Sequence, residues 1–440
     1  MLFKNSATAK RRVLRLLDET PTLVRGNLDF LVERMLGKRD RLLNAAEHYG
    51  TPAYLFDREE MDQSITTFKT AFHTAMPQCK IFYAIKSNPH PLLVKNAVRH
   101  GLGLDASSGR ELQLALDLGA KDILFTGPGK TNAELELALA HADRVTLNLD
   151  SVRELEKVGD LAQRKNVLIR AGIRIFTKYH GKWTKFGIPA ETLKSFWDRA
   201  SAFPNVQLQG IQVHMSWNSD TRPYANIIRV IADQLKTFSK AQRDSIRFID
   251  LGGGFLPHRT EGLFPSTLPQ GQILTIADSH YQKETLFKDR YYLSESLSLE
   301  DYAKGIAQAA KRYLLPLTNC ALYFEPGRIL SNNAMHVALR VMDVKSPTLA
   351  IADGGINMIG FDRFESDYFP LINLTHPARK EIPFHVFGSL CTPHDLWGTH
   401  CFATQVTEGD ILTIPYQGAY TLTLSQPHFI KPVPDVFPIN

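Results

Sequence analysis

A single lysine ends an apolar segment in the first quarter of the chain. Residues 81–88 read IFYAIKSN, and Lys86 is the only charged residue among them. Because burial removes an ammonium group from water, such a lysine is expected either to reach solvent or to lie in a pocket with a purpose. In a pocket, its amine could form a Schiff base with a carbonyl cofactor. The segment alone leaves both interpretations open.

Other residues with useful chemistry end similar segments farther along the chain. The backbone N–H groups of Gly252–Gly254 can form a concave site for phosphate, and Arg328 can add a bidentate ion pair to the same phosphate. If the ligand contains a pyridine ring, Glu325 can form a hydrogen bond to its nitrogen, and His214 can stack on its face. Each has an ordinary alternative: Asp105 could cap a helix, the histidine could be a core residue, and the glycines could form a tight turn. Together with the lysine, the set describes a site for pyridoxal 5′-phosphate.

Strand-like segments alternate with helical ones between residues 80 and 328, which indicates βα units and a parallel sheet. The strand-like segments are 80–86, 102–108, 122–127, 145–150, 167–175, 208–216, 247–254 and 321–328. This number of units in about 250 residues predicts an α/β fold with a closed (β/α)8 TIM-type barrel. The carboxyl ends of its strands lie at one rim, where the lysine, the acids, the histidine and the glycines should gather.

Two further regions flank the barrel, which is assigned to residues 51–328. Residues 1–50 form an N-terminal helical extension that ends near Gly50 and is expected to pack on the β domain. Residues 329–440 carry strand-like segments between Pro-, Gly- and Asp-rich turns, which predicts a C-terminal all-β domain. A loop-rich insertion covers residues 255–297.

Composition narrows the class of protein. The net charge is +6, from 51 basic and 45 acidic residues without long runs, and it does not indicate a nucleic-acid partner. No apolar run approaches the roughly 20 residues of a membrane span, and the basic N-terminus lacks the features of a secretory signal. The cysteines form no CxxC pair and no metal site, which favours reduced thiols and a cytoplasmic location. They are Cys79, Cys320, Cys391 and Cys401.

A series of short motifs follows the predicted strands in order. The chain contains YAIKSN, GLDASSGREL, GPGK, TKFG, VHMS, DLGGGF, FEPGR, ADGG, GSLCTPHD and GAY. In these motifs it resembles the fold-type III (alanine racemase-fold) pyridoxal-phosphate-dependent decarboxylases, the family of diaminopimelate, ornithine and arginine decarboxylases. The resemblance spans roughly residues 50–425.

The resemblance implies a role for each motif residue. Lys86 carries the Schiff base, His214 stacks on the cofactor ring, and Glu325 pairs with the pyridine nitrogen. Asp105 and Arg174 belong to the supporting shell. The implied phosphate ligands are Gly252, Gly253, Gly254, Gly327, Arg328 and Tyr420.

The same resemblance implies a homodimer with shared active sites. In this family the neighbouring chain supplies a cysteine that acts as general acid, and the matching residue is Cys391 in GSLCTPHD. Without that motif, a buried thiol would be the ordinary interpretation. Asp395 follows in the same motif and is assigned to the substrate region.

The implied activity is α-decarboxylation of an amino acid, which releases CO2 and an amine. Glu325 argues against a racemase, because alanine racemases of this fold place an arginine at the pyridine nitrogen and an uncharged pyridine is a poorer electron sink. A non-catalytic homologue that binds pyridoxal phosphate is a further alternative. Such a protein is expected to lose the cysteine, the phosphate-binding tyrosine or the second domain, and this chain keeps all three.

Substrate choice depends on residues that depart from the family pattern. Thr392 follows the cysteine, where acidic residues contact a substrate amine, and Arg363 and Tyr368 are candidates for holding a far carboxylate. Trp217 occupies the position of the usual phosphate-binding serine and is expected to narrow the pocket. A diaminopimelate-decarboxylase-like activity is the first hypothesis. A modified amino acid of siderophore- or antibiotic-type metabolism is the second, and ornithine, lysine and arginine stay open.

Overall fold

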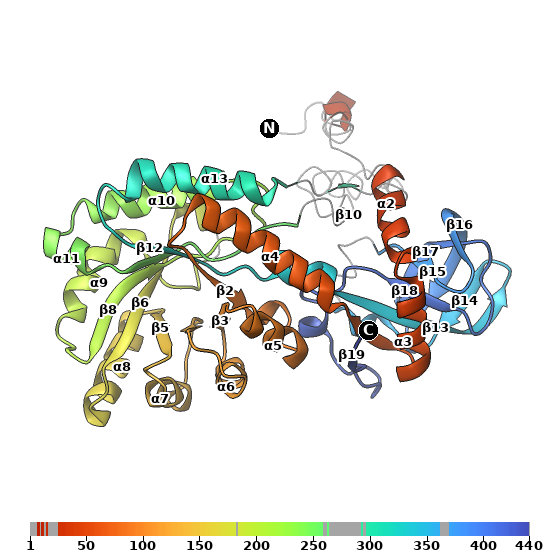
Figure 1. Ribbon diagram of the computed structural model, residues 1–440, viewed down its shortest axis with the longest axis horizontal. Helices are drawn as coiled ribbons and strands as arrows, with labels where there is room; N and C mark the ends of the chain where they lie inside the picture. The colour runs from red at the N-terminus through yellow and green to blue at the C-terminus, as the bar shows by residue number, and fades with distance from the viewer. Residues whose placement is uncertain are drawn as a thin grey trace. The chain divides into compact units, whose positions relative to one another are not determined.

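The chain divides into two compact units (Figure 1). The computed structural model describes residues 7, 8, 10–12, 15, 25–181, 184–257, 262–263, 292–293, 296–360 and 369–439. One unit contains Arg58–Pro257 and Ser296–Asn332, and the other contains Met1–Asp57, His258–Glu295 and Asn333–Asn440. Most of the insertion assigned to 255–297 lies outside the described residues.

Eight parallel strands close into a barrel in the first unit. They are β2 (Lys80–Ala84), β3 (Gly103–Ala106), β4 (Ile123–Phe125), β5 (Val145–Leu149), β6 (Ile169–Phe176), β8 (Val206–Gln212), β9 (Phe248–Asp250) and β12 (Ala321–Phe324). Neighbouring strands pair in chain order, and β12 pairs with β2 to complete the ring. Each strand overlaps one of the predicted segments, so the predicted barrel is confirmed. A short strand, β7 (Ile188–Pro189), also pairs with β6.

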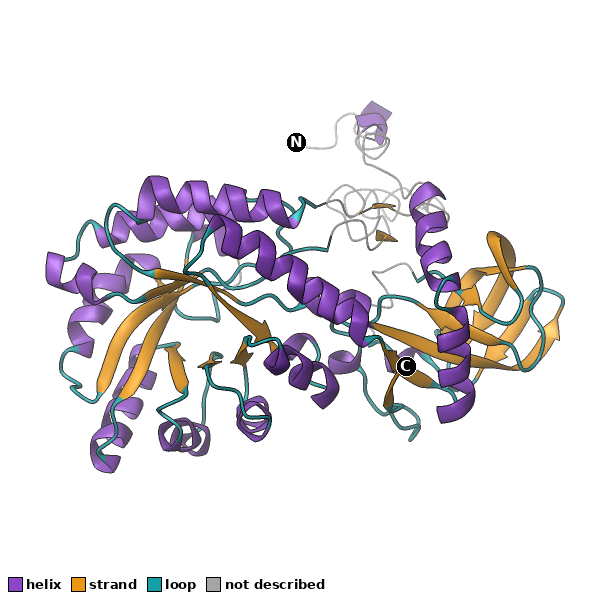
Figure 2. Cartoon of the chain, viewed as in Figure 1, coloured by secondary structure: helices purple, strands orange, loops and turns teal. Residues whose placement is uncertain are grey.

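Helices of the same unit lie around these strands (Figure 2). They are α4 (Arg58–Ala75), α5 (Pro91–Arg99), α6 (Gly109–Asp117), α7 (Asn132–Ala140), α8 (Val152–Lys165), α9 (Leu193–Ala200), α10 (Arg222–Leu235), α11 (Lys240–Ser245), α13 (Leu299–Ala309) and α14 (Arg328–Ser331). The side chains of Ser108, Thr131 and Ser298 accept hydrogen bonds from backbone N–H groups in the first turns of α6, α7 and α13. Such caps satisfy donors that a first turn leaves unpaired, so they set where each rim loop ends. In the described ranges, no helix has both the length and the apolar character to cross a membrane.

The second unit contains a mixed β-sheet. Its strands are β1 (Ala53–Phe56), β13 (Met335–Ser346), β14 (Leu349–Ala352), β15 (Ile372–Asn373), β16 (Pro377–Phe387), β17 (Leu396–Ala403), β18 (Ile411–Ile414) and β19 (Val436–Pro438). They lie in the order β14–β16–β17–β15–β18–β13–β1–β19, and β13 also pairs with β14. The sequence boundary at residue 51 places β1 in the barrel, whereas β1 pairs with β13 and β19. Its partners lie far along the chain, so no local pattern announces this pairing.

Two helices, α2 (Arg25–Leu36) and α3 (Arg39–Tyr49), belong to the same unit as this sheet. Val32, Met35 and Leu42 are fully buried and share a hydrophobic core with Ile372 of β15. The α3 helix stops at Gly50, whose φ of +84° suits a residue without a Cβ atom. The apolar faces of both helices are therefore covered by the β-sheet.

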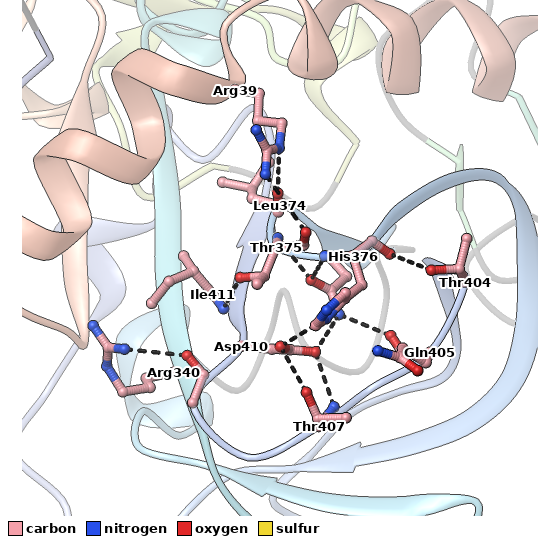
Figure 3. A network of polar contacts seen from close by, with 12 residues as sticks. Arg39, Arg340, Leu374, Thr375, His376, Thr404, Gln405, Thr407, Asp410 and Ile411 are labelled. Atoms are coloured by element: carbon pink, nitrogen blue, oxygen red, sulfur yellow. Dashed lines mark hydrogen bonds and ion pairs between the residues drawn. The ribbon is translucent and has the colours of Figure 1, made fainter.

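Buried Asp410 organises the loops beside this sheet (Figure 3). Its Oδ2 accepts the side-chain amide of Asn373 at 2.7 Å and the backbone amide of Thr407 at 2.9 Å. Its Oδ1 lies 3.0 Å from Nδ1 of His376. Burial raises the pKa of this carboxyl, but these hydrogen bonds outweigh burial and hold it below its usual value. Arg39 of α3 donates to backbone carbonyl groups of the loop that contains the histidine, which connects the helix to the sheet.

A buried ion pair joins the loop before α7 to helix α8. Nζ of Lys130 lies 2.6 Å from Oε1 of Glu154, and the two side chains are 2% and 7% exposed. The ammonium also donates to the carbonyl oxygens of Gly127 and Asn148, at 2.8 and 2.9 Å. Since all three ammonium hydrogens have acceptors, neither charge is left uncompensated.

We expect Lys130→Met to lower the free energy of unfolding by about 3–5 kcal/mol, because it leaves the Glu154 carboxylate buried without its partner. Lys165→Met is the matched control, since its pair with Glu136 spans 3.8 Å and the side chains are 44% and 49% exposed. That change should cost less than about 1 kcal/mol. Urea unfolding followed by circular dichroism measures both. Equal stability of the two variants would contradict a stabilising role for the buried pair.

Candidate active site

The carboxyl ends of the barrel strands bring chemically distinct segments to one rim. Lys86 follows β2 in a short 3₁₀ turn, and Asp105 lies near the end of β3. His214 comes shortly after β8, Gly252–Gly254 follow β9, and Glu325 comes directly after β12. Because parallel strands end on the same side of a barrel, these segments can contact one another. The distances below show that they do.

Lys86 is held at the rim by a buried carboxylate. Its Nζ lies 3.2 Å from Oδ2 of Asp105, and the two side chains are 30% and 0% exposed. Burial, helped by the charge of Glu325, raises the pKa of Asp105 to about 6, although the lysine opposes this shift. The amine is therefore neither extended into solvent nor fully enclosed, and it points where a ligand at the rim can meet it.

Glu325 is buried beside a second acid. Its Oε1 accepts Nε2 of Gln212 at 3.2 Å, and its Oε2 lies 3.5 Å from Nδ1 of His214. Burial raises the pKa of this carboxyl, but neighbouring groups, the Lys86 ammonium among them, outweigh burial and lower the pKa to about 2. Burial and the charge of Glu325 raise the pKa of Asp250 well above its usual value. The surroundings therefore shift the pKa values of the two acids in opposite directions.

The His214 ring is neutral in this setting. Its Nδ1 accepts the backbone N–H of Gly253 at 3.2 Å, which places the ring proton on Nε2, 3.4 Å from Oγ of Ser216. Burial lowers the pKa of the imidazole to about 4, and the nearby Glu325 carboxylate offsets only part of this effect. A neutral ring can stack on an aromatic ligand without adding a positive charge.

The glycine triplet is shaped by both conformation and space. Gly252 and Gly254 have φ values of +67° and +84°. A Cβ atom at Gly253 would lie 2.2 Å from the carbonyl oxygen of Glu325. The Gly252 amide donates to Oδ1 of Asp250 at 2.9 Å, and the Gly253 amide donates to the histidine. Two of the three amides thus bond inside the protein, which narrows the expected phosphate contact to the Gly254 amide and its surroundings.

The segment after β12 packs directly on the lysine turn. The backbone amide of Ala84 donates to the carbonyl oxygen of Pro326 at 3.2 Å. A Cβ atom at Gly327 would lie 3.2 Å from Cβ of Ala84, so glycine permits this close approach. Arg328 follows at the start of α14, and its guanidinium carbon lies 4.8 Å from the ring centroid of Trp217.

Arg174 lies near the end of β6 and is 9% exposed. Its guanidinium carbon lies 4.3 Å from the ring centroid of Phe186, in the TKFG motif. A Cβ atom at Gly187 would come within 2.5 Å of the Arg174 carbonyl oxygen. The motif therefore covers the arginine, and the supporting role assigned to Arg174 stays a prediction.

In the second unit, Cys391 lies in a loop that an acid stabilises. It is the exposed one of the four cysteines, and the other three are buried. The carboxylate of Asp395 accepts the backbone amides of Ile356 and Leu390, at 2.7 and 2.6 Å. Both oxygens of Asp395 therefore serve the loop, and its assignment to the substrate stays a prediction.

Of the remaining assigned residues, the structure describes two and leaves two outside its described ranges. Thr392 donates its backbone amide to the carbonyl oxygen of Leu390 at 2.8 Å, within the same loop as the cysteine. Tyr420 has a φ of +59°. Arg363 and Tyr368 lie outside the described residues. The roles of these four side chains stay predictions.

Two residues of the rim were not predicted. Gln212 and Asp250 contact the Glu325 carboxylate and the glycine triplet, and they are register partners on β8 and β9. The alternation of side chains along a strand places Gln212 on the same side as His214, two residues later. The two-residue spacing between Gln212 and His214 was therefore the feature of the sequence that could have predicted the position of Gln212.

Comparison with known proteins places this rim in a family. The family described as "Pyridoxal-dependent decarboxylase, pyridoxal binding domain" matches residues 62–276. The diaminopimelate decarboxylase of Zymomonas mobilis is 25% identical over 405 residues, 88% of this chain and 87% of its own. These matches support a fold-type III pyridoxal-dependent decarboxylase.

Two other similar proteins extend the comparison with this decarboxylase. The L-glutamyl-[BtrI acyl-carrier protein] decarboxylase of Niallia circulans is 25% identical over 409 residues, 87% of each chain. The crystal structure of diaminopimelate decarboxylase from M. jannaschii in complex with L-lysine shares the fold. It has a TM-score of 0.74 at 21% identity and covers 90% of this chain and 89% of its own.

The coenzyme of such a decarboxylase is pyridoxal 5′-phosphate, and the rim residues fit it. Oε2 of Glu325 and Oδ1 of Asp105 are buried oxygen atoms without a hydrogen bond in the described structure. A buried acceptor without a donor costs free energy, so a ligand N–H group beside Glu325 would remove that cost. The decarboxylase thus presents an acceptor for the pyridine nitrogen, an amine for the carbonyl carbon and bare glycine backbone.

We expect the free energy of unfolding to decrease as the pH falls from about 6.5 to about 4, with a contribution from His214. Its pKa in the folded chain, about 4, lies below its ordinary value of 6.5, so within this window the unfolded chain binds a proton that the folded chain does not. At its steepest, this contribution is about 1.4 kcal/mol per pH unit. Urea unfolding at a series of pH values measures it.

His214→Asn is the control for this pH dependence, because its Oδ1 can accept the Gly253 amide and does not titrate. The variant should show a shallower loss of stability over the same pH range. Identical slopes for the two proteins would mean that His214 is not held neutral by its surroundings.

Proposed function

We propose that this decarboxylase acts on a diamino acid of the diaminopimelate type, and that Lys86 and Glu325 are the two central charged residues of its active site. The observation that carries the proposal is the ionised, buried carboxylate of Glu325, which shares one rim with the Lys86–Asp105 pair. An ionised acid at this place can hold a proton on a pyridine nitrogen. A protonated pyridine withdraws electrons far better than a neutral one, which is what loss of a carboxylate requires.

The proposed roles follow from the contacts of each side chain. Bound pyridoxal 5′-phosphate supplies an electron sink for the bond that breaks. Lys86 holds the coenzyme covalently through its amine, and Asp105 orients that amine at 3.2 Å. Gln212 orients the Glu325 carboxylate, and the raised pKa of Asp250 favours negative charge on Glu325 rather than on Asp250. His214 lies against the coenzyme ring as a neutral, stacking group.

Phosphate recognition is assigned to groups on both sides of the ring. The proposed ligands are Gly254, Gly327, Arg328 and Tyr420. Gly252 and Gly253, whose amides bond Asp250 and His214, are proposed to shape the segment around the phosphate. A guanidinium group can make two parallel hydrogen bonds to phosphate oxygens, which fixes the coenzyme more tightly than a point charge does. Arg174, packed under the TKFG motif, is proposed to support this arrangement from β6.

The proton that replaces the departing carboxylate is assigned to Cys391 of a second copy. We propose a homodimer in which the loop that carries Cys391 completes the site of the neighbouring chain. Its support is that Cys391 is exposed, whereas burial raises the pKa of the other cysteines and makes them poor proton donors and acceptors. The absence of disulfides among these free thiols also supports a cytoplasmic location.

Two substrate classes are supported by different observations. Diaminopimelate comes first because similar proteins over most of the chain carry that name. A glutamyl group or another modified amino acid comes second, because the similar protein of Niallia circulans is named for a carrier-bound glutamyl group. Thr392, Arg363 and Tyr368 are the proposed contacts with the far end of the substrate.

We expect meso-diaminopimelate to give the fastest CO2 release in a panel that also contains ornithine, lysine, arginine and glutamate on an acyl-carrier protein. Lys86→Ala should abolish both this release and the visible absorbance of the bound coenzyme. Lys80→Ala, at the start of the strand that leads to Lys86, is the matched control, because its ammonium pairs with Asp122, 2.6 Å away, and its side chain is 51% exposed. It should keep both signals.

If only the glutamate on the acyl-carrier protein is turned over, the second substrate hypothesis is correct and the first is wrong. Binding of the coenzyme without CO2 release from any member of the panel would support the non-catalytic alternative. Normal absorbance and turnover in the Lys86→Ala variant would remove the central assignment.

Shared active sites predict complementation between two inactive variants. Lys86→Ala and Cys391→Ala homodimers should each lose activity, the second by about 10²–10⁴-fold. Mixed in equal amounts and allowed to exchange subunits, they should recover about one quarter of wild-type activity, because half of the dimers then contain one intact site. A mixture that stays inactive, with exchange verified by mass spectrometry of tagged chains, would place both residues in the same chain's site.

A further inference from the structure

Trp217 has an unusual place in the turn between β8 and α10. Its φ is +59°, in the left-handed region that a residue with a Cβ atom rarely adopts. Its side chain is also 54% exposed, although an indole ring gains free energy from burial. Both features are unfavourable by themselves, so contacts around the residue must hold it in this position.

The turn is joined to the glycine triplet through the residues on either side of Trp217. The backbone amide of Asn218 donates to the carbonyl oxygen of Gly254 at 2.9 Å, and its side-chain amide donates to the carbonyl oxygen of Met215 at 3.1 Å. The hydroxyl of Tyr302 donates to the carbonyl oxygen of Asn218 at 2.6 Å. A Cβ atom at Gly254 would come within 1.9 Å of the Met215 carbonyl oxygen, so the two segments are in direct contact.

The exposed indole meets one cation. The guanidinium carbon of Arg328 lies 4.8 Å from the centroid of the Trp217 ring. A guanidinium group that lies over an aromatic face is attracted to it while its in-plane N–H groups stay available to oxygen ligands. The contact therefore restricts the arginine without using the donors that a phosphate needs.

We propose that Trp217 is a positioning residue for the phosphate of the coenzyme. Its ring holds the Arg328 guanidinium beside Gly252–Gly254, and this replaces the hydroxyl donor of the serine found in the family pattern. The inference rests on the proposed phosphate role of Arg328. The left-handed backbone is the conformation that carries the indole from a turn attached to Gly254 to the arginine.

Equilibrium binding to the coenzyme-free, full-length protein tests this role. The probes are pyridoxal 5′-phosphate and pyridoxal, which lacks only the phosphate, and the readout is the visible absorbance of the bound form. Trp217→Ala should raise the Kd for pyridoxal 5′-phosphate about tenfold, as expected for loss of one cation–π contact. It should leave the Kd for pyridoxal unchanged.

Trp217→Phe is the conservative control, because it keeps an aromatic face and removes the indole N–H. It should bind pyridoxal 5′-phosphate nearly as well as the wild type. A Phe variant as weak as the Ala variant overturns the inference, and so does an Ala variant with wild-type affinity. An equal loss of affinity for pyridoxal also overturns it, because the effect would then lie away from the phosphate.

A double-mutant cycle with Arg328→Ala separates this inference from the role on which it rests. If Trp217 acts through the arginine, Trp217→Ala should cause no further loss in the Arg328→Ala background. Additive losses would overturn the inference and leave the phosphate role of Arg328 intact. Unchanged affinity of Arg328→Ala for pyridoxal 5′-phosphate would remove that role, and the inference with it.

Discussion

Closure of the parallel barrel is the constraint on which the rest of the site depends. Because β12 returns to pair with β2, each of the eight strands has hydrogen-bonded neighbours on both sides. The strand ends are therefore fixed relative to one another, and side chains from distant parts of the sequence meet at fixed distances. The contact of Lys86 with Asp105 and that of Gln212 with Glu325 both join residues that follow or end different strands. The backbone hydrogen bond from Ala84 to Pro326 joins the segments of β2 and β12, where the barrel closes.

Crowding of acids at this rim gives them different ionisation states. Asp105, Asp250 and Glu325 are all buried, and within the described part of the chain the Lys86 ammonium opposes the effect of burial on Asp105 and Glu325. Three buried anions so close together would repel one another strongly, so protons are retained where the opposing charge is weakest. The nearby Lys86 ammonium favours the ionised form of Glu325. The arrangement thus produces one strong acid and one very weak acid from two ordinary carboxyl groups on neighbouring strands.

Much of the fold follows from local patterns, and the contacts within the site follow from them only in part. The eight strands were predictable because each apolar segment ends in glycine or in a charged or small polar residue before a helix begins. The convergence of Lys86, Glu325 and the glycines followed from barrel geometry alone. The raised pKa of Asp250 was not predictable, because it depends on the register of β9 with β8 and β12. The pairing of β1 with β13 was likewise hidden, since strand partners carry no sequence mark when they lie far apart along the chain.

The hydrogen bonds of the glycine triplet affect how readily the protein can bind its coenzyme again. Gly252 and Gly253 bond Asp250 and His214, so protein groups themselves fix the shape of this segment. The entropy cost of ordering this backbone on binding is then small, and the fraction of protein that carries coenzyme depends on the coenzyme concentration. A cell that runs short of vitamin B6 would accumulate a dormant but intact pool of this enzyme, ready to recover without new synthesis once the vitamin returns.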